Sequence, residues 1–151
     1  MYIIYNEIKD LILDTIVELF QVERESVENL VEVEPTKDAK HGDFYTNAAM
    51  SLTKNLKRSP QEIAIKIIES IKSHELFNKV EIAGPGFINM YMSHKAWSKT
   101  LLNILECGKD YGKVNIGKGQ KFNIEYVSVN PTGPMHIGHA RGAVVGAAAD
   151  E

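Results

Sequence analysis

The stretch VEIAGPGFINMYM, residues 80–92, decides the fold of the first part of this chain. Its middle, Gly84-Pro85-Gly86, is a strong turn signal, because glycine and proline interrupt regular structure. The apolar and β-branched residues on either side favour extended backbone. We therefore expect two strands joined at this turn, and a small antiparallel sheet that contains both of them.

Helical patterns surround this stretch, so we expect an α+β domain. Upstream, an amphipathic helix repeats apolar residues at three- and four-residue steps: Ile8, Leu11, Ile12, Ile16, Leu19 and Phe20. A second helix follows Thr46 and carries one apolar face: Ala48, Ala49, Leu52 and Leu56. Between these helices, LVEVEP at 30–35 predicts a short strand, and HGDF at 41–44 predicts a turn.

The third helix has the clearest start. Ser59 can cap it, Pro60 suits its first turn, and Glu62 completes a capping box three residues after Ser59. Its expected buried stripe consists of isoleucines: Ile63, Ile67, Ile68 and Ile71. A fourth helix is expected to start near Ser93 and to turn four apolar residues inward: Trp97, Leu101, Ile104 and Leu105.

Residues 108–119, GKDYGKVNIGKG, contain four glycines and three lysines and form the best candidate linker. This linker divides the α+β domain, residues 1–107, from residues 120–151. In the last part, FNIEYVSV at 122–129 has the composition of a strand buried on both faces of a parallel sheet. A turn, NPTGP, and a helix-forming stretch follow. The order of strand, tight loop and helix predicts the start of a Rossmann-like α/β domain.

The composition is that of a globular protein, with 44% apolar and 25% charged residues. The one cysteine, Cys107, excludes an internal disulfide, and we expect it to be a small, half-buried apolar residue. No apolar run approaches the roughly 18 residues that span a bilayer, and the N-terminus lacks the basic start of a signal peptide. We therefore expect a cytoplasmic protein without a membrane partner.

The net charge of -3 gives no global signature of nucleic-acid binding, but the bases are unevenly distributed. Residues 1–34 hold nine acids and two bases, whereas residues 54–79 hold six bases and three acids. This distribution fits a locally positive face on an acidic molecule. Taken alone, however, this distribution of charge favours an ordinary solvated helix surface.

The segment from Glu125 to Arg141, EYVSVNPTGPMHIGHAR, carries the candidate chemistry. It leads into a helix whose first N–H groups lack partners and whose dipole is positive there, which suits a phosphate. His136 and His139 are three residues apart, so both rings lie on one side of a helical turn and can donate to a triphosphate. Gly138 leaves room for a base or ribose near the backbone.

Polar residues at or near the end of the expected strand can bind a second polar substrate: Glu125, Ser128 and Asn130. The charge of Glu125 suits a cationic amino acid. Transfer of AMP to the carboxylate of such a substrate needs only alignment and stabilisation of phosphate charge. Alternatively, the histidines are structural and Glu125 pairs with a buried base. We expect no metal site, because no nearby cysteine or carboxylate completes a tetrahedral set.

HIGH at 136–139 matches the signature tetrapeptide of class I aminoacyl-tRNA synthetases. The longer stretch SVNPTGPMHIGHARG at 128–142 closely resembles the version found in arginyl-tRNA synthetases. HGDFYTNAAMSLTKNLKRSPQEIAIKI at 41–67 and VEIAGPGFIN at 80–89 look like that family's N-terminal additional domain. The resemblance implies an arginine-tRNA ligase that uses ATP with Mg²⁺, L-arginine and tRNA(Arg), and that acts as a monomer.

The same resemblance implies roles for individual residues of the last part. His136 and His139 would bind and stabilise the ATP phosphates, and Gly138 would let adenosine approach. The residues that would contact arginine are Glu125, Ser128 and Asn130.

In the additional domain, Phe87 and Asn89 match the positions that contact a D-loop nucleotide of the tRNA. An aromatic face stacks on an unpaired base, and an amide reads the edge of that base. As alternatives, Phe87 is plain core and Asn89 is simple polarity at a strand edge. Three bases could add phosphate contacts, although the sequence does not place them on the face of Phe87: Lys54, Lys57 and Arg58.

The chain ends shortly after His139, so we expect a fragment that is inactive alone and whose residues 120–151 are disordered, swapped or poorly packed. Two other functions are considered. One is a module that binds the tRNA D-loop without catalysis. The other is a nucleotidyltransferase of the same superfamily, and the match to the additional domain argues against it.

Overall fold

The computed structural model describes residues 2–113, 117–121, 123, 125, 127, 133, 134 and 136–150. The chain separates into two compact units, Met1–Lys113 and Val114–Glu151, and each is described by itself. Within the described residues, no helix is both long and apolar enough to cross a membrane.

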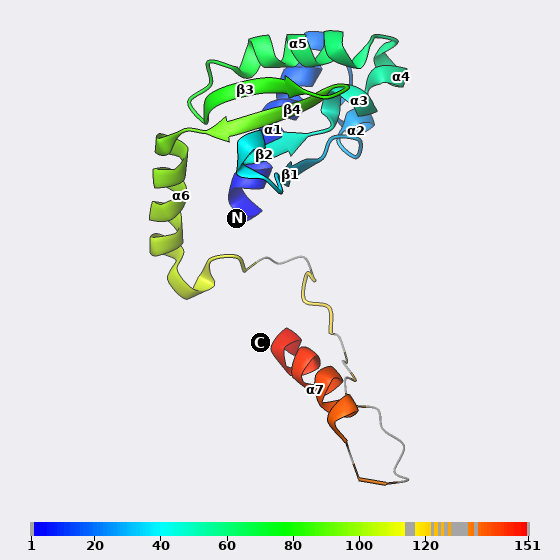
Figure 1. Cartoon of the computed structure of the whole chain (residues 1–151), viewed down its shortest axis with the longest axis vertical. Coiled ribbons are helices and arrows are strands. Elements are labelled where there is room, and N and C mark those ends of the chain that lie inside the picture. Colours follow the sequence, from blue (N-terminus) through cyan, green and yellow to red (C-terminus); the bar gives the residue numbers. More distant parts are fainter. Residues whose placement is uncertain are drawn as a thin grey trace. The chain divides into compact units, whose positions relative to one another are not determined.

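The first unit contains a four-stranded antiparallel sheet (Figure 1). Its strands are β1 (Val33–Pro35), β2 (Phe44–Thr46), β3 (Phe77–Ala83) and β4 (Phe87–Met92), in the spatial order β1-β2-β4-β3. The predicted strands on either side of the Gly84–Gly86 turn are confirmed as the β3–β4 hairpin. Its register pairs Glu81 with Asn89 and Ala83 with Phe87. The small antiparallel sheet with helices predicted from the sequence is therefore present.

Helices pack on one face of this sheet and at its end. They are α1 (Tyr2–Phe20), α2 (Arg24–Val27), α3 (Ala48–Ser51), α4 (Thr53–Leu56) and α5 (Pro60–Ile71), with a short 3₁₀ turn, η1 (Ala39–His41), before β2. Five isoleucines of α1 and α5 are fully buried, and so are two residues of β4 that face them: Ile8, Ile12, Ile16, Ile63, Ile67, Ile88 and Met90. Burial of these side chains, at roughly 1.5–3 kcal/mol each, holds the helices to the sheet.

The predicted second helix is divided into α3 and α4 at the buried Leu52. The predicted start of α5 is confirmed in detail. The Glu62 N–H donates to Ser59 Oγ at 3.2 Å, and the Ser59 N–H donates to the Glu62 carboxylate at 3.1 Å. The two hydrogen bonds of this capping box satisfy N–H groups that would otherwise lack partners. Of the predicted buried stripe, Ile68 is only half-buried.

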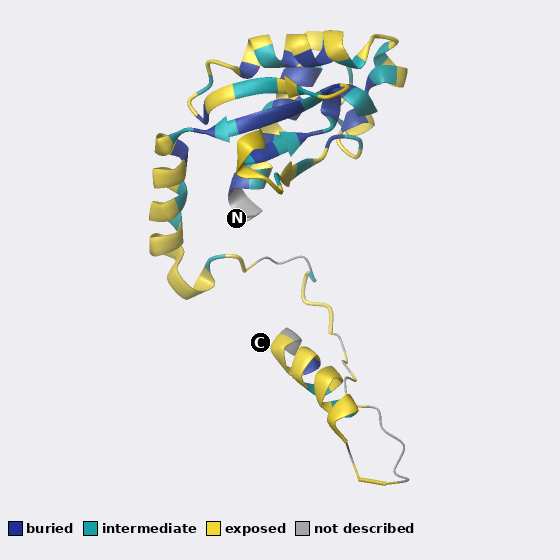
Figure 2. Cartoon of the chain, viewed as in Figure 1, coloured by how far each residue is buried: buried dark blue, intermediate teal, exposed yellow. Residues whose placement is uncertain are grey.

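The predicted inward face of the fourth helix, α6 (His94–Cys107), is wrong. Its apolar residues are exposed: Trp97 by 42%, Leu101 by 56%, Ile104 by 37% and Leu105 by 68%. Only the first turn of α6 packs on the sheet, where Ala96 is buried and the Trp97 ring stacks on Phe44 at 6.2 Å. The rest of the helix projects beyond the core (Figure 2). Cys107 at its end is exposed rather than half-buried.

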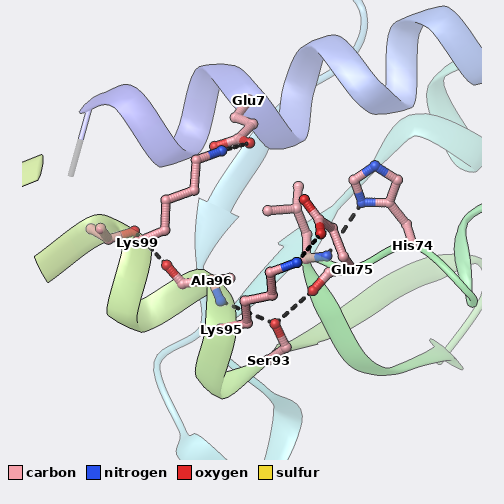
Figure 3. Close-up of polar contacts among 9 residues, drawn as sticks. Glu7, His74, Glu75, Ser93, Lys95, Ala96 and Lys99 are labelled. Atoms are coloured by element: carbon pink, nitrogen blue, oxygen red, sulfur yellow. Dashed lines mark hydrogen bonds and ion pairs between the residues drawn. The ribbon is translucent and has the colours of Figure 1, made fainter. Parts of the chain in front are cut away.

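Polar contacts fix the packed end of α6 (Figure 3). The Ser93 side chain caps the helix by accepting from the Ala96 N–H at 3.1 Å, and it donates to the Glu75 carbonyl oxygen at 2.6 Å. Lys95 pairs with the Glu75 carboxylate, and Lys99 reaches Glu7 of α1 at 2.7 Å. These contacts join α6 to the segment before β3 and to α1.

The second unit contains the helix α7 (Ile137–Asp150), as predicted after the NPTGP turn. The strand predicted at 122–129 is not seen in the described residues Asn123, Glu125 and Val127, which are exposed and lie outside any strand. The other residues of that stretch lie outside the described part. A strand buried on both faces needs neighbouring strands and helices, whereas Gly146 is the only described residue of this unit that is buried. The expectation that residues 120–151 pack poorly when alone stays a prediction.

Candidate nucleic-acid interface

The face of the sheet opposite the helices carries the candidate site. Successive residues of a strand point to opposite faces, so Phe87, Asn89 and Tyr91 of β4 lie opposite Ile88 and Met90, which face the core. Asn89 pairs with Tyr45 of β2 on one side and with Glu81 of β3 on the other. Residues paired across strands share a face. The predicted pair, Phe87 and Asn89, therefore lies on one face with an aromatic and an acidic neighbour.

A cavity of about 320 Å³ opens over these residues, and we call it the Phe87 pocket. Its lining comes from the loop before β2, from β2 itself and from the β3–β4 hairpin: Thr36, Lys37, His41, Tyr45, Ala83, Gly84, Phe87 and Asn89. The volume lies at the lower end of the range for small-molecule sites. The lining is mainly aromatic and apolar with a few polar groups, a combination that suits a flat heterocycle.

The aromatic wall of the pocket is held in place by a neighbouring strand. The rings of Tyr45 and Phe87 meet edge to face, with centroids 5.7 Å apart and planes at 76°. The Tyr45 hydroxyl donates to the Glu34 carboxylate of β1 at 2.6 Å, and this hydrogen bond raises the pKa of Tyr45. Because the two rings are not stacked face to face, Tyr45 does not cover Phe87 as a stacking base would.

Asn89 supplies the polar group of the pocket. Asn89 is only 5% exposed, and its side chain has no hydrogen bond to any other described residue. In the described part of the chain, every side-chain N or O atom that is fully buried has a partner, so the Asn89 amide keeps its small exposure towards the pocket. A ligand that closed the pocket without pairing this amide would incur a cost of about 1–3 kcal/mol. A ligand with a hydrogen-bonding edge would supply the partner.

The loop that forms the second wall is fastened to the sheet. The Tyr91 hydroxyl lies 2.7 Å from the Lys40 carbonyl oxygen and 2.7 Å from the Glu81 carboxylate. The Met92 N–H donates to the Asp43 carboxylate at 2.7 Å. Lys79 forms an ion pair with Glu81, and the hydrogen bonds from Lys79 and Tyr91 lower the pKa of Glu81. The pocket is therefore largely preformed, which lowers the entropic cost of binding.

The HIGH tetrapeptide lies at the start of α7, where the sequence placed it. The Gly138 N–H donates to Nδ1 of His136 at 3.1 Å, and the His136 N–H donates to Nδ1 of His139 at 3.2 Å. The two imidazole rings stack with centroids 3.8 Å apart. Since each Nδ1 accepts a hydrogen bond, the neutral rings carry their protons on Nε2. A Cβ atom at Gly138 would lie 2.9 Å from Cε1 of His136, so a side chain there would displace the exposed His136 ring from this position.

The predicted site residues divide into three sets. The structure brings Phe87 and Asn89 into one pocket, and it brings His136, Gly138 and His139 together at a helix start. Glu125 is exposed. Ser128 and Asn130 lie outside the described residues. Among the residues that are described, no group of three or more His, Cys, Asp or Glu could hold a metal ion.

Sequence reasoning missed Tyr45, Lys37 and His41 as parts of the pocket. The alternation FYT at 44–46 could have assigned Tyr45 to the face opposite the buried Phe44. The alternation does not show which strand pairs with residues 44–46, because that pairing joins residues far apart in the sequence.

Two solved structures share this fold. An arginyl-tRNA synthetase crystal structure from Plasmodium falciparum aligns with 95% of this chain and 27% of its own, with a TM-score of 0.67 and 23% identity. The arginyl-tRNA synthetase of Thermus thermophilus aligns with 94% of this chain and 22% of its own, with a TM-score of 0.56 and 20% identity. The architecture is thus one that occurs in aminoacyl-tRNA synthetases.

Sequence comparison is more specific. Residues 6–92 match the family described as "Arginyl tRNA synthetase N terminal domain", and this chain belongs to that family. A protein named arginine–tRNA ligase from Rhodopseudomonas palustris is 53% identical over 116 residues, which are 77% of this chain and 19% of the relative. A Brucella ovis protein of the same name is 53% identical over 114 residues, 76% of this chain and 20% of the relative. The chain therefore spans about a fifth of these relatives. The predicted resemblance is confirmed for the N-terminal domain, and residues 136–139 lie outside the family match.

Proposed function

We propose that this chain is the tRNA-contacting N-terminal region of an arginine–tRNA ligase, and that the Phe87 pocket binds an unpaired nucleotide of the D-loop of tRNA(Arg). The observation that carries this proposal is Asn89, whose nearly buried amide lacks a partner among the described residues and lines an aromatic cavity. A base stacked on Phe87 would bring its hydrogen-bonding edge to this amide. Single-stranded RNA is commonly read in this way.

The residues around HIGH fit the activation of arginine by ATP. Here the carboxylate of L-arginine attacks the α-phosphorus of ATP, and pyrophosphate leaves. His136 and His139, with Nε2–H groups available, would donate to the phosphate oxygens, and Gly138 would admit adenosine. Mg²⁺ would accompany the ATP. The residues proposed for arginine remain Glu125, Ser128 and Asn130.

For the 151-residue chain alone we propose tRNA binding without activation of arginine. The described residues around HIGH are largely exposed, and an aqueous setting weakens electrostatic stabilisation of a transition state. Pyrophosphate exchange in the presence of arginine and tRNA should therefore be absent. Measurable exchange would refute this part of the proposal. A ligase of this kind acts where proteins are made, so we expect a cytoplasmic location. The monomeric state is expected from the family resemblance alone.

Binding of a fluorescein-labelled tRNA(Arg) transcript to the chain tests the pocket. Phe87→Ala and Asn89→Ala should each weaken binding roughly tenfold, because stacking on one aromatic residue contributes about 1–3 kcal/mol. Asn78→Ala is the matched control, since Asn78 is an exposed amide on the same hairpin. If Phe87→Ala keeps its circular dichroism spectrum and its affinity for the transcript, the pocket does not bind a base.

Transcripts with an abasic site at each unpaired D-loop position in turn would identify the nucleotide. One of these transcripts should bind the parent chain more weakly than the intact transcript does. Asn89→Ala should weaken the binding of that transcript little further. Such non-additivity is the mark of two groups in contact. Additive losses at every D-loop position would contradict direct contact between Asn89 and a D-loop base.

A further inference from the structure

We infer that the corner between α4 and α5 binds RNA phosphates next to the nucleotide held in the Phe87 pocket. We call the three cationic residues of this corner the basic corner: Lys54, Lys57 and Arg58. The inference rests on the proposed function, because it adds a backbone-binding surface to the base-binding pocket. It assigns the ligand as the phosphodiester groups of the same RNA strand.

The β3–β4 turn connects the pocket to the basic corner. Gly84 lines the pocket, and Gly86 directly precedes Phe87. A Cβ atom at Gly86 would lie 2.8 Å from Cβ of Pro60 and 3.3 Å from Cγ of Met50, so the turn packs against the first residue of α5. Arg58 is two residues before Pro60, which places its Cα within about 7 Å of the Cα of Pro60.

The arrangement of the elements agrees with this contact. Figure 1 shows α3 and α4 at the end of the sheet where β3 turns into β4. The sequence alone could not place the basic corner relative to Phe87. The packing of Gly86 on Pro60 now places it beside the turn that borders the pocket.

The charges of the basic corner are available to a ligand. Lys54, Lys57 and Arg58 are all exposed, and none of them forms an ion pair with a described acid. Glu62, the acid nearest in sequence, accepts the Ser59 N–H at 3.1 Å and so caps α5. Two bases near the candidate site are already paired, Lys40 with Asp38 and Lys79 with Glu81.

Lys37 lies on the other side of the pocket, in the wall formed by the loop before β2. It too forms no ion pair with a described acid. An aromatic and amide pocket between cationic side chains matches a single RNA strand, in which each base is flanked by two phosphates. A phosphorylated protein or a lipid surface could meet the charges, but neither would place a flat, hydrogen-bonding group on Phe87 and Asn89.

The test is the salt dependence of binding to the labelled tRNA(Arg) transcript, measured with the full chain over roughly 50–200 mM salt. The variant combines Lys57→Asn with Arg58→Gln. Lys57 has a φ of 50° and a ψ of 41°, a left-handed conformation that asparagine tolerates better than lysine. This substitution therefore removes a charge without adding backbone strain, and loss of folding does not explain a loss of binding.

The matched control combines Lys66→Gln with Lys72→Gln. Both lysines are exposed, neither forms an ion pair with a described acid, and the change in net charge is the same. Lys66 and Lys72 lie about 9 and 18 Å along the axis of α5 from Pro60. A general effect of net charge would act equally in both double variants.

We expect the corner variant to lower the slope of log K against log salt by about two, one for each phosphate that is no longer neutralised. Its Kd near 100 mM salt should rise on the order of tenfold or more. The control should keep the slope of the parent. Equal slopes in the corner and control variants would overturn the basic corner as a phosphate site.

Phe87→Ala separates this inference from the proposed function, since loss of stacking should weaken binding and leave the slope unchanged. If Phe87→Ala lowers the affinity while the corner variant keeps the slope of the parent, only the basic corner is overturned. If Phe87→Ala keeps the affinity of the parent while the corner variant lowers the slope, only the base pocket is overturned. A parent chain that does not bind the transcript would overturn both.

Discussion

The rings of Tyr45 and Phe87 meet nearly at right angles, with their centroids 5.7 Å apart, across the boundary between β2 and β4. Through this contact, Tyr45 of β2 positions the ring of Phe87 in β4, which we propose stacks on a base. The Tyr45 hydroxyl is in turn held by Glu34 of β1 at 2.6 Å. Three strands therefore cooperate to fix the orientation of one aromatic side chain.

Substitutions at Tyr45 should separate these two contacts. Tyr45→Phe keeps the ring edge and loses only an exposed hydrogen bond, so the affinity for the tRNA(Arg) transcript should change by less than about threefold. Tyr45→Leu removes the edge-to-face pair, which is worth about 0.5–1.5 kcal/mol, and should weaken binding by roughly threefold to tenfold. Fluorescence anisotropy measures both values. Equal losses in the two variants would assign the effect to the hydroxyl group instead.

Gly86→Ala should loosen the connection between the β3–β4 turn and α5. The new Cβ would lie 2.8 Å from Cβ of Pro60, and the φ of 145° is unfavourable for residues with side chains. We expect a loss of about 1–3 kcal/mol in the free energy of unfolding, measured by urea denaturation. Gly84→Ala is the control. Its φ of 54° is also positive, but a Cβ there would meet nothing within 4 Å.

The two variants differ in both backbone cost and contact. A side chain at the φ of Gly84 costs about 1 kcal/mol or more, whereas the φ of Gly86 is nearly exclusive to glycine and the new Cβ also meets Pro60. Gly86→Ala should be clearly the less stable of the two. A Gly84→Ala variant that is equally destabilised would show that contact with Pro60 adds nothing.

The parts of the fold that were predictable are those that local chemistry determines. The capping box of Ser59 and Glu62 and the Gly84–Gly86 turn each involve residues a few positions apart, and both are present. The HIGH tetrapeptide at the start of α7 is of the same kind. Short-range hydrogen bonds and backbone preferences act before any tertiary contact forms.

The parts that were missed depend on contacts distant in sequence. Periodicity showed that α6 has an apolar side, but it could not show what covers that side, and Trp97 and Leu101 are exposed. Likewise, Tyr45 pairs with Asn89 although three helices and a third strand separate their two strands in the sequence. Phe87 and Asn89 were predicted through family resemblance. Their position in one pocket with Tyr45 is a property of the assembled sheet.

The attachment of α6 should depend on pH through Glu75. The hydrogen bond from Lys95 lowers the pKa of Glu75 below its usual value of 4.5, and the nearby charges of Lys99 and His74 add to this (Figure 3). A carboxyl whose pKa is lowered in the folded state stabilises folding above the unfolded pKa. That contribution declines as the pH falls below about 4.5 and disappears below the folded pKa. Because the pair is exposed, the effect on stability should be small.

A carboxyl-detected NMR titration measures the Glu75 pKa directly. In the parent chain the midpoint should lie below 4.5, and in Lys95→Gln it should move up towards that value. Thermal melts should show the same linkage: the difference between the parent and Glu75→Gln should be largest near neutral pH and should vanish in acid. Glu69→Gln is the control, because Glu69 is exposed and has no ion pair with a described base. A Glu75 midpoint that does not respond to Lys95→Gln would mean that the ion pair at the start of α6 does not form in solution.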